Sequence, residues 1–492
     1  MTNAQGSSTS SLKLLLLCCF LSAGIFMMTK GSPVSLLPIG LYTLGIVLSV
    51  ALKRPRPDQD ILLGFLILSF FVDDISEVAW GRTVDTWTEE AGALLFKSYG
   101  LTGMEVFAIV MAACLALSQF PRLFRDWYRI GLLNVTTVGF GVFIASLIAG
   151  VFGVFDGGKV NTMFIQIRFL HCLPLWVFIG FVVWRDRDFS NKALKWSTIM
   201  LVLKSIQAVF VYYTHYELYK QHEEYLVDHY FSGFAVIALV VLLMTLIRDK
   251  RFIMRLLCLA SISFVSLAYL FNDRRTSYVG LAFALALLPV LMPFRIIRRF
   301  AIRGTLAIAG AVLFTMITWH MPAPLGFIGN LYRSFGTETG YEEPSYRDLE
   351  NANLLHAVTS RPMTGIGYGK EFDEVFPMPD ISYVYERYRM IPHNLFLASW
   401  AFGGPLTIAA LSLLFAAMIA TAGKLFQKAR EPDLLLLGLV SLFYFLQYLT
   451  YTFGDLGFQI QRNQMMAGLL FGACFRIQAE LTRETKAQER FR

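Results

Sequence analysis

The segment SGFAVIALVVLLMTLIRDKRFIMR, residues 232–255, decides the fold class of this chain. Residues 232–247 carry no charge, whereas residues 248–255 carry four basic side chains and one acidic side chain. An apolar run of this kind satisfies its backbone hydrogen bonds internally, as a helix, when it crosses a bilayer. Lys and Arg gather in the cytoplasmic loops that follow such helices. The segment therefore predicts a membrane-spanning helix that ends in a cytoplasmic loop.

The composition of the whole chain agrees with a membrane protein. Of its 492 residues, 56% are hydrophobic and only 16% are charged, whereas about a quarter of a soluble domain is charged. The net charge of +8 is explained by basic inner loops beside anionic lipid, so we expect a lipid bilayer as partner and no nucleic acid. The cysteines lack the spacing of a disulfide scaffold or a zinc site, and we expect small core residues. They are Cys18, Cys19, Cys114, Cys172, Cys258 and Cys474.

Apolar runs recur along almost the whole length and predict an all-α polytopic membrane protein with about 12–14 transmembrane helices and one long periplasmic loop. The first run is expected to be an uncleaved span and not a signal peptide, because further spans follow at once. The fourteen predicted spans are 11–29, 34–52, 61–79, 100–119, 132–154, 164–184, 195–213, 232–247, 252–271, 278–294, 303–319, 394–420, 433–453 and 464–478.

The basic segments between these spans predict the orientation. With the N-terminus in the cytoplasm they all become cytoplasmic, and the even number of spans returns the C-terminus to the same side. They are 53–57, 122–129, 185–195, 248–255, 295–303, 424–430 and the tail.

The chain accordingly divides into three parts. Residues 1–319 hold the first eleven spans, residues 320–393 form the periplasmic loop with short helices, and residues 394–492 hold the last three spans and a basic cytoplasmic tail. A loop of about 74 residues is too long for a mere connector, so we expect it to be functional.

Within this loop, residues 361–372 read RPMTGIGYGKEF. A nucleotide-binding glycine loop follows a strand in a soluble α/β unit, whereas Gly365, Gly367 and Gly369 follow a predicted helix, 345–360, outside the cytoplasm. The glycines instead predict a tight turn that brings backbone N–H groups close to a neighbour. That neighbour is either an anion or a packed segment of the protein, and the sequence leaves both open.

Basic residues gather at the outer ends of several predicted spans. Arg274 and Arg275 lie in the turn FNDRRTSYVG, residues 271–280, Arg347 begins the helix before the glycines, and His393 opens a span. The topology predicts that they share one membrane face. Each also has a structural interpretation: the arginines as interfacial anchors or surface charges, and His393 as a helix cap.

Two further arginines are candidates for an anion site. Arg168 lies within a predicted span, in FIQIRFLHCLPLWVF, where an arginine costs about 2.5–3.5 kcal/mol on insertion scales. An anionic substrate would offset that cost, and so would an ion pair with an acidic residue of the third span. Arg462, in GFQIQRNQ, is a candidate contact in the last outer loop. Lys204 also lies within a predicted span and is a weaker candidate for the same kind of site. The acidic residues of the third predicted span, the possible partners of Arg168, are Asp73, Asp74 and Glu77.

No metal site is expected. His215, His222 and His229 are seven residues apart, which on a helix separates them by roughly 10 Å each. That distance is too large for one shared ion, and the aromatic residues among them are typical of a helix lying on the membrane.

The arginine turn, the long loop with P-x-x-G-x-G-x-G, and His393-Asn394 opening a glycine-containing span together resemble the O-antigen ligase and O-antigen polymerase superfamily of bacterial envelope glycosyltransferases. The resemblance covers roughly residues 260–410 by motif and the whole chain by number of spans. It implies an enzyme of the bacterial inner membrane with a periplasmic active site, needing neither metal nor cofactor. The implied reaction transfers a glycan from an undecaprenyl-diphosphate carrier to a hydroxyl acceptor, either a glycan or the lipid A core.

The same resemblance implies roles for individual residues. His393 is expected to activate or orient the acceptor hydroxyl, because imidazole is a suitable base near neutral pH. Arg347, Arg274 and Arg275 are expected to hold the diphosphate, since the guanidinium fork matches phosphate oxygens. Arg168 and Arg462 are added as further diphosphate contacts.

The acceptor remains open at this stage. Asn394 stands where the ligase branch often has Ser or Thr, so ligase, polymerase and protein O-glycosyltransferase all remain. The alternative functions are a multi-span transporter or flippase of an anionic or lipid-linked substrate, and a sensor or scaffold without activity. The long outer loop and the basic residues at the outer face favour the enzyme.

Overall fold

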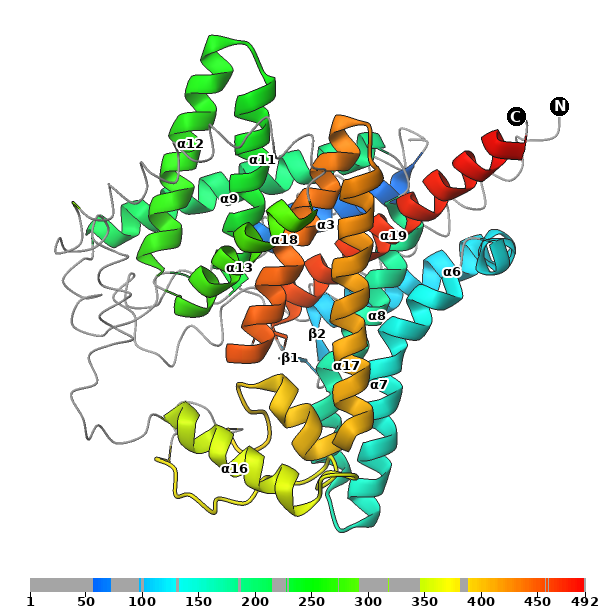
Figure 1. Ribbon diagram of the computed structural model, residues 1–492, viewed down its shortest axis with the longest axis vertical. Coiled ribbons are helices and arrows are strands. Elements are labelled where there is room, and N and C mark those ends of the chain that lie inside the picture. The colour runs from blue at the N-terminus through cyan, green and yellow to red at the C-terminus, as the bar shows by residue number, and fades with distance from the viewer. Residues whose placement is uncertain are drawn as a thin grey trace.

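The computed structural model describes residues 56–71, 97–98, 101–129, 132–184, 187–214, 227, 230–272, 274–291, 317, 346–380, 388–455, 457–458 and 460–490. Helices make up almost all of this part of the chain, and its one sheet is an antiparallel pair of two-residue strands (Figure 1). The elements are α3 (Pro57–Phe71), β1 (Lys97–Ser98), β2 (Leu101–Thr102), α6 (Gly103–Arg129), α7 (Leu132–Phe155), α8 (Val160–Val183), α9 (Arg187–Thr214), α11 (Tyr230–Arg248), α12 (Phe252–Phe271), α13 (Arg275–Leu291), α16 (Tyr346–Ser360), α17 (Leu395–Lys428), α18 (Pro432–Gly454) and α19 (Gln461–Arg490).

Six of the described helices are long and apolar enough to cross a membrane, namely α8, α9, α11, α12, α17 and α18. The expected class, an all-α polytopic membrane protein, is thereby confirmed. The number of spans stays a prediction, because the expected spans at 11–29 and 34–52, and all of 303–319 except residue 317, lie outside the described residues. The last expected span lies in α19, which is not among the six.

The expected helix limits hold where an apolar run is bounded by a turn. Helix α12 covers the predicted span 252–271 without any shift. The basic segments expected to be loops at 122–129, 185–195 and 424–430 are instead largely helical: α6 runs to Arg129, α9 begins at Arg187 and α17 reaches Lys428. Hydropathy marks where a chain leaves the bilayer. A helix continues past that point because its hydrogen bonds are local.

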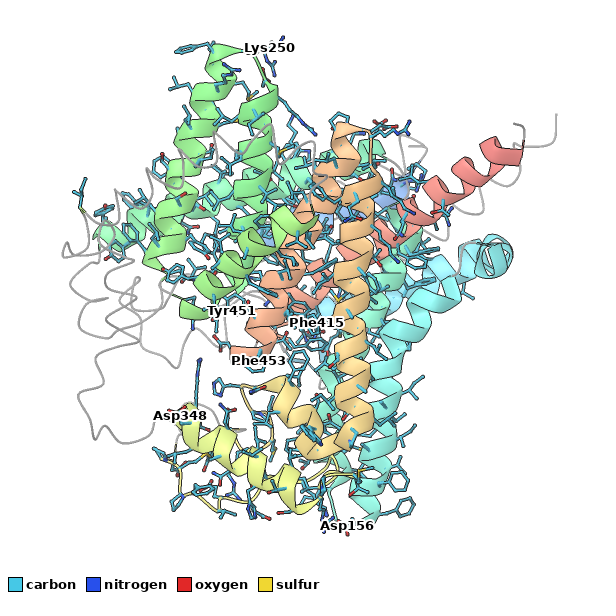
Figure 2. All side chains as sticks on the ribbon, in the orientation of Figure 1. Asp156, Lys250, Asp348, Phe415, Tyr451 and Phe453 are labelled. Atoms are coloured by element: carbon cyan, nitrogen blue, oxygen red, sulfur yellow. The ribbon has the colours of Figure 1, made fainter. Side chains whose placement is uncertain are left out.

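Labelled residues from three connections show at which end of the bundle each connection lies. Lys250, in the expected cytoplasmic turn between α11 and α12, lies at one end, whereas Asp156 and Asp348, from the expected outer segments, lie at the other (Figure 2). These three connections therefore lie at the ends that the expected alternation assigns to them. Which compartment each end faces stays a prediction.

Helices α8 and α19 pack closely through small residues. A Cβ atom on Gly180 of α8 would lie 2.4 Å from the carbonyl oxygen of Leu469, and one on Gly472 of α19 would lie 2.2 Å from that of Val177. Glycines allow such backbone approach between helices in a membrane, where packing replaces the hydrophobic effect as the source of association. The buried cysteines Cys172 and Cys474 belong to the core around this contact, as expected of small core residues.

Helix α17 is broken near its start. Gly404 has a φ of 67° and a ψ of −168°, and Pro405 follows it. Proline has no N–H, so the carbonyl of Ala401 loses its normal partner four residues on. The turn at Gly404 also moves away the backbone N–H group that would normally donate to the carbonyl of Phe402. From Pro405 to Lys428 the helix is roughly 36 Å long, which exceeds the hydrocarbon thickness of about 30 Å.

The glycine stretch fills this break. Ile366 N–H donates to the carbonyl of Ala401 at 2.8 Å, and Gly367 N–H donates to that of Phe402 at 2.9 Å. Gly369 N–H donates to the side chain of Gln166 in α8 at 2.6 Å. These N–H groups are therefore used within the protein. Of the two interpretations that the sequence left open for Gly365, Gly367 and Gly369, the packed neighbour is correct for these groups and the anion is not.

An ion pair joins the same loop to the turn between α7 and α8. Asp156 contacts Lys370 at 2.5 Å and also contacts Arg361. Hydrogen bonds from these two side chains, with Lys370 contributing most, lower the pKa of the Asp156 carboxyl from its ordinary value to about 2. The loop is thus anchored at the break in α17, at α8 and at this turn.

The close approach of Gly367 to α7 predicts a large effect of a methyl group. Gly367 has a φ of 85°, and an added Cβ would lie 2.2 Å from the Cα of Gly153. Gly367→Ala should destabilise the protein by about 3 kcal/mol, from crowding and from the left-handed backbone together. Gly157→Ala is the matched control, because Gly157 has a φ of 89° and open space around its Cβ position; it should cost only about 1–2 kcal/mol. Thermal unfolding in detergent measures both, and equal shifts for the two variants would contradict the packing described here.

Candidate functional site at one end of the bundle

Helix α16 brings two polar contacts to one end of the bundle. It packs against α17 and lies beyond the end of α18 (Figure 1), and Figure 2 shows Asp348 of α16 beyond Tyr451 and Phe453, which lie in the last turn of α18. The first two turns of α16 carry Arg347 and Glu350, and each of them reaches a different partner.

Arg347 contacts the end of α18. Its Nη1 donates to the carbonyl oxygen of Gly454 at 2.9 Å, and its Nη2 lies 3.5 Å from Oδ1 of Asp455. The other carboxylate oxygen of Asp455 lies 3.9 Å from Nη1 of Arg274, the residue just before α13. The side chains of Asp455 and Arg274 are only 2% and 5% exposed, whereas that of Arg347 is 43% exposed. Of the two guanidinium groups, Arg347 is therefore the one that a phosphate can reach.

Glu350 holds His393. The buried Glu350 carboxylate accepts the backbone N–H of His393 at 3.0 Å, and both of its oxygens lie 3.2 Å from Nδ1 of the ring. A carboxylate beside Nδ1 favours the tautomer with the proton on that atom, which leaves Nε2 as an acceptor. The ring is 17% exposed, and the Tyr346 ring meets it edge to face with 6.0 Å between centroids.

His393 is not the cap of the helix that follows it. The N-cap of α17 is Asn394, whose side chain accepts the backbone N–H of Leu397 at 3.1 Å. The capping interpretation of His393 is therefore wrong. His393 lies one residue before the cap, and its ring contacts α16.

The two contacts lie close together because Arg347 and Glu350 are three residues apart on one helix. Residues at this spacing lie about 5–6 Å apart between their Cβ atoms. The structure thus links Arg274, Arg347 and His393 through Asp455 and Glu350. These three residues come from distant parts of the sequence and were expected to share one face.

The other candidates are placed differently. Arg275 begins α13 and Arg168 lies in α8, but their side chains are not among the described ones. Arg462 is the second residue of α19 and is fully buried, so a phosphate would reach it only after a rearrangement of the helices. Lys204 of α9 is buried as well. The acidic residues of the third predicted span and the three spaced histidines lie outside the described residues; they are Asp73, Asp74, Glu77, His215, His222 and His229.

Sequence reasoning missed the two acidic residues of the site. Neither Glu350 nor Asp455 was among the candidate residues. A signal existed for Asp455: it is an acidic residue two positions after the predicted span 433–453, on the same expected membrane face as the arginine turn. For Glu350 no comparable signal exists, because its partner is 43 residues away.

The arrangement has two chemical capacities. A half-exposed guanidinium in contact with a buried carboxylate and, through it, a second guanidinium can bind an anion at its exposed side. An imidazole oriented by a carboxylate can accept a proton at Nε2 and hold the resulting charge. Both groups lie at one end of the bundle, near the start of α17.

Comparison with known proteins adds no assignment. No protein-family model matches this chain, and no curated protein shows significant similarity to it. The resemblance by motif described above therefore remains a prediction.

The contact between Arg274 and Asp455 predicts a strong dependence of stability on the carboxylate. Asp455→Asn leaves the buried Arg274 without this charged partner and should cost about 3–5 kcal/mol, the range found when one member of a buried pair is removed. Asp433→Asn is the control, because its pair with Arg248 is solvent-accessible on both sides and is worth about 1 kcal/mol or less. Thermal unfolding of the two purified variants measures the difference. If Asp433→Asn costs as much as Asp455→Asn, the buried pair is not the stronger contact.

Proposed function

We propose that this protein is a membrane glycosyltransferase that moves a glycan from an undecaprenyl-diphosphate carrier to a hydroxyl acceptor at the periplasmic face of the bacterial inner membrane. The observation that carries the proposal is the meeting of Arg347 and the His393–Glu350 pair at one end of a polytopic helical bundle. The resemblance by motif, which assigns roles to the same Arg347 and His393, is the second support. A transporter remains the alternative, and no contact among the described residues favours it.

In the proposed reaction His393 serves as the base. The acceptor hydroxyl loses its proton to Nε2 of His393 while its oxygen forms a bond to the anomeric carbon of the donor sugar. Glu350 keeps the proton of the ring on Nδ1 and stabilises the imidazolium that forms. Such general-base assistance contributes about 10²–10⁴-fold to a rate.

Arg347 stabilises the leaving group. The bond between the anomeric carbon and the phosphate oxygen breaks as the new glycosidic bond forms, and its electron pair stays on the lipid diphosphate. A guanidinium that contacts these oxygens stabilises the developing charge. Arg274 is enclosed, so its part is to fix Asp455, which in turn positions Arg347. The direct contact of Arg274 with phosphate that the sequence suggested would require that this enclosure opens.

The roles of His393 and Glu350 predict a graded loss of transfer. His393→Ala should lower the rate of transfer at least about 100-fold because the base is lost, and Glu350→Gln should lower it less because the ring stays in place without its counter-charge. His356→Ala is the control, since His356 is exposed on the far part of α16. Transfer of radiolabelled glycan by membranes with equal amounts of inserted protein measures the rates. Full activity of His393→Ala would refute the assignment.

The acceptor is identified by the surface glycan of a deletion strain. Loss of long chains, with one unit still attached to lipid A, means a polymerase, whereas intact chains stranded on the carrier mean a ligase. Electrophoresis of the surface glycan distinguishes the two outcomes. A glycan profile identical to that of the parent strain would contradict the proposed function.

A further inference from the structure

The buried side chain of Gln166 joins three separate parts of the chain. It lies in the second turn of α8, and its Oε1 accepts the N–H of Gly369 at 2.6 Å. Its Nε2 donates to the carbonyl oxygen of Lys370 at 2.7 Å and to that of Met390 at 3.1 Å. The amide thus connects α8 to the end of the glycine loop and to the segment that precedes α17.

The pattern of these bonds requires a carboxamide. One neighbour is an N–H donor and two are carbonyl acceptors, so the oxygen must face Gly369 and the NH₂ group must face the other two. A carboxylate in the same place would face two carbonyl oxygens, and an apolar side chain would leave one buried and two partly buried backbone groups without this partner. Each orphaned group is costly in a protein interior.

The connection to Met390 lies close to His393 in the chain. Met390 lies three residues before His393, and the intervening Ile391 and Pro392 line a small pocket together with Gln166. On the other side, Glu350 accepts the backbone N–H of His393. The segment that carries the imidazole is therefore held at both ends, by Gln166 from α8 and by Glu350 from α16.

We propose that Gln166 is a positioning residue for the proposed transfer reaction, which it serves by fixing the chain that carries His393. The inference rests on the proposed function for its effect on catalysis. Its structural part, the placement of His393, is tested without any substrate. Gln166 itself does not touch the reacting groups and acts through the carbonyl of Met390.

Two variants test the placement. In Gln166→Met the hydrogen bonds are lost at nearly constant volume, and in the milder Gln166→Asn the amide is kept but is one methylene too short. The probe is diethyl pyrocarbonate, which acylates accessible imidazoles, with modification of His393 followed by mass spectrometry on the inserted, monodisperse protein. Both variants should be acylated at His393 several-fold faster than the wild type. Gln59→Met is the matched control: Gln59 is also buried and donates to a carbonyl of α8, that of Val183 at the opposite end of the helix.

The same variants are then assayed for transfer. Since a misplacement of about 1 Å can cost about 100-fold in rate, kcat should fall about 10- to 100-fold in Gln166→Met, with little change in KM for the lipid-linked donor. An unchanged rate of His393 acylation in both variants overturns the proposal. A rise in KM for the donor with an unchanged kcat overturns it as well. If the wild type transfers no glycan, the proposed function fails, while the acylation rates still decide whether Gln166 positions His393.

Discussion

The break in α17 is the constraint on which the arrangement of the site depends. A buried backbone carbonyl without a hydrogen-bond partner is costly, and Ala401 and Phe402 are both buried. Gly404 and Pro405 create such groups at Ala401 and Phe402, and the N–H groups of Ile366 and Gly367 satisfy them. A loop from outside the helical bundle is thereby joined to a spanning helix by backbone hydrogen bonds, with no side chain needed at the joint.

This joint has consequences in both directions along the chain. Before the glycine loop, α16 packs against α17 and reaches the end of α18 through Arg347, which contacts Gly454 and Asp455. After it, the chain returns past Gln166 to His393 and enters α17. The buried Asp455 and Glu350 complete the arrangement, since each accepts a contact from a basic side chain of another segment. A carboxylate buried in this way is tolerated only when charged or polar partners surround it.

The sequence predicted the parts of this structure that depend on local patterns. The apolar run of α12 is bounded by Arg251 and Asn272, and its limits were predicted without error. The ends of α6 and α17 were predicted too early, because basic residues at the membrane surface prolong a helix as readily as they end a span. The common location of Arg274, Arg347 and His393 followed from topology alone.

The parts that depend on pairing between distant segments were not predictable. Nothing in RPMTGIGYGKEF indicates that its N–H groups complete a broken helix, because the break lies some forty residues further along the chain. The partners of Arg347 and His393 were missed for the same reason. A charge pattern identifies which residues need a partner, but only the packed helices decide which partner each one finds.

The most direct test of the central claim is a cross-link between α16 and the end of α18 in intact cells. Arg347→Cys and the exposed Phe453→Cys, combined in a background without the native cysteines, should be joined by a short, membrane-impermeant bifunctional thiol reagent added from the outside. Phe453→Cys paired with Lys250→Cys should give no product. A product from the first pair in intact cells agrees with the site as described. A cross-linked product that forms only after the membrane is permeabilised would contradict it. The absence of any product, although the reagent modifies each single cysteine, would also contradict it.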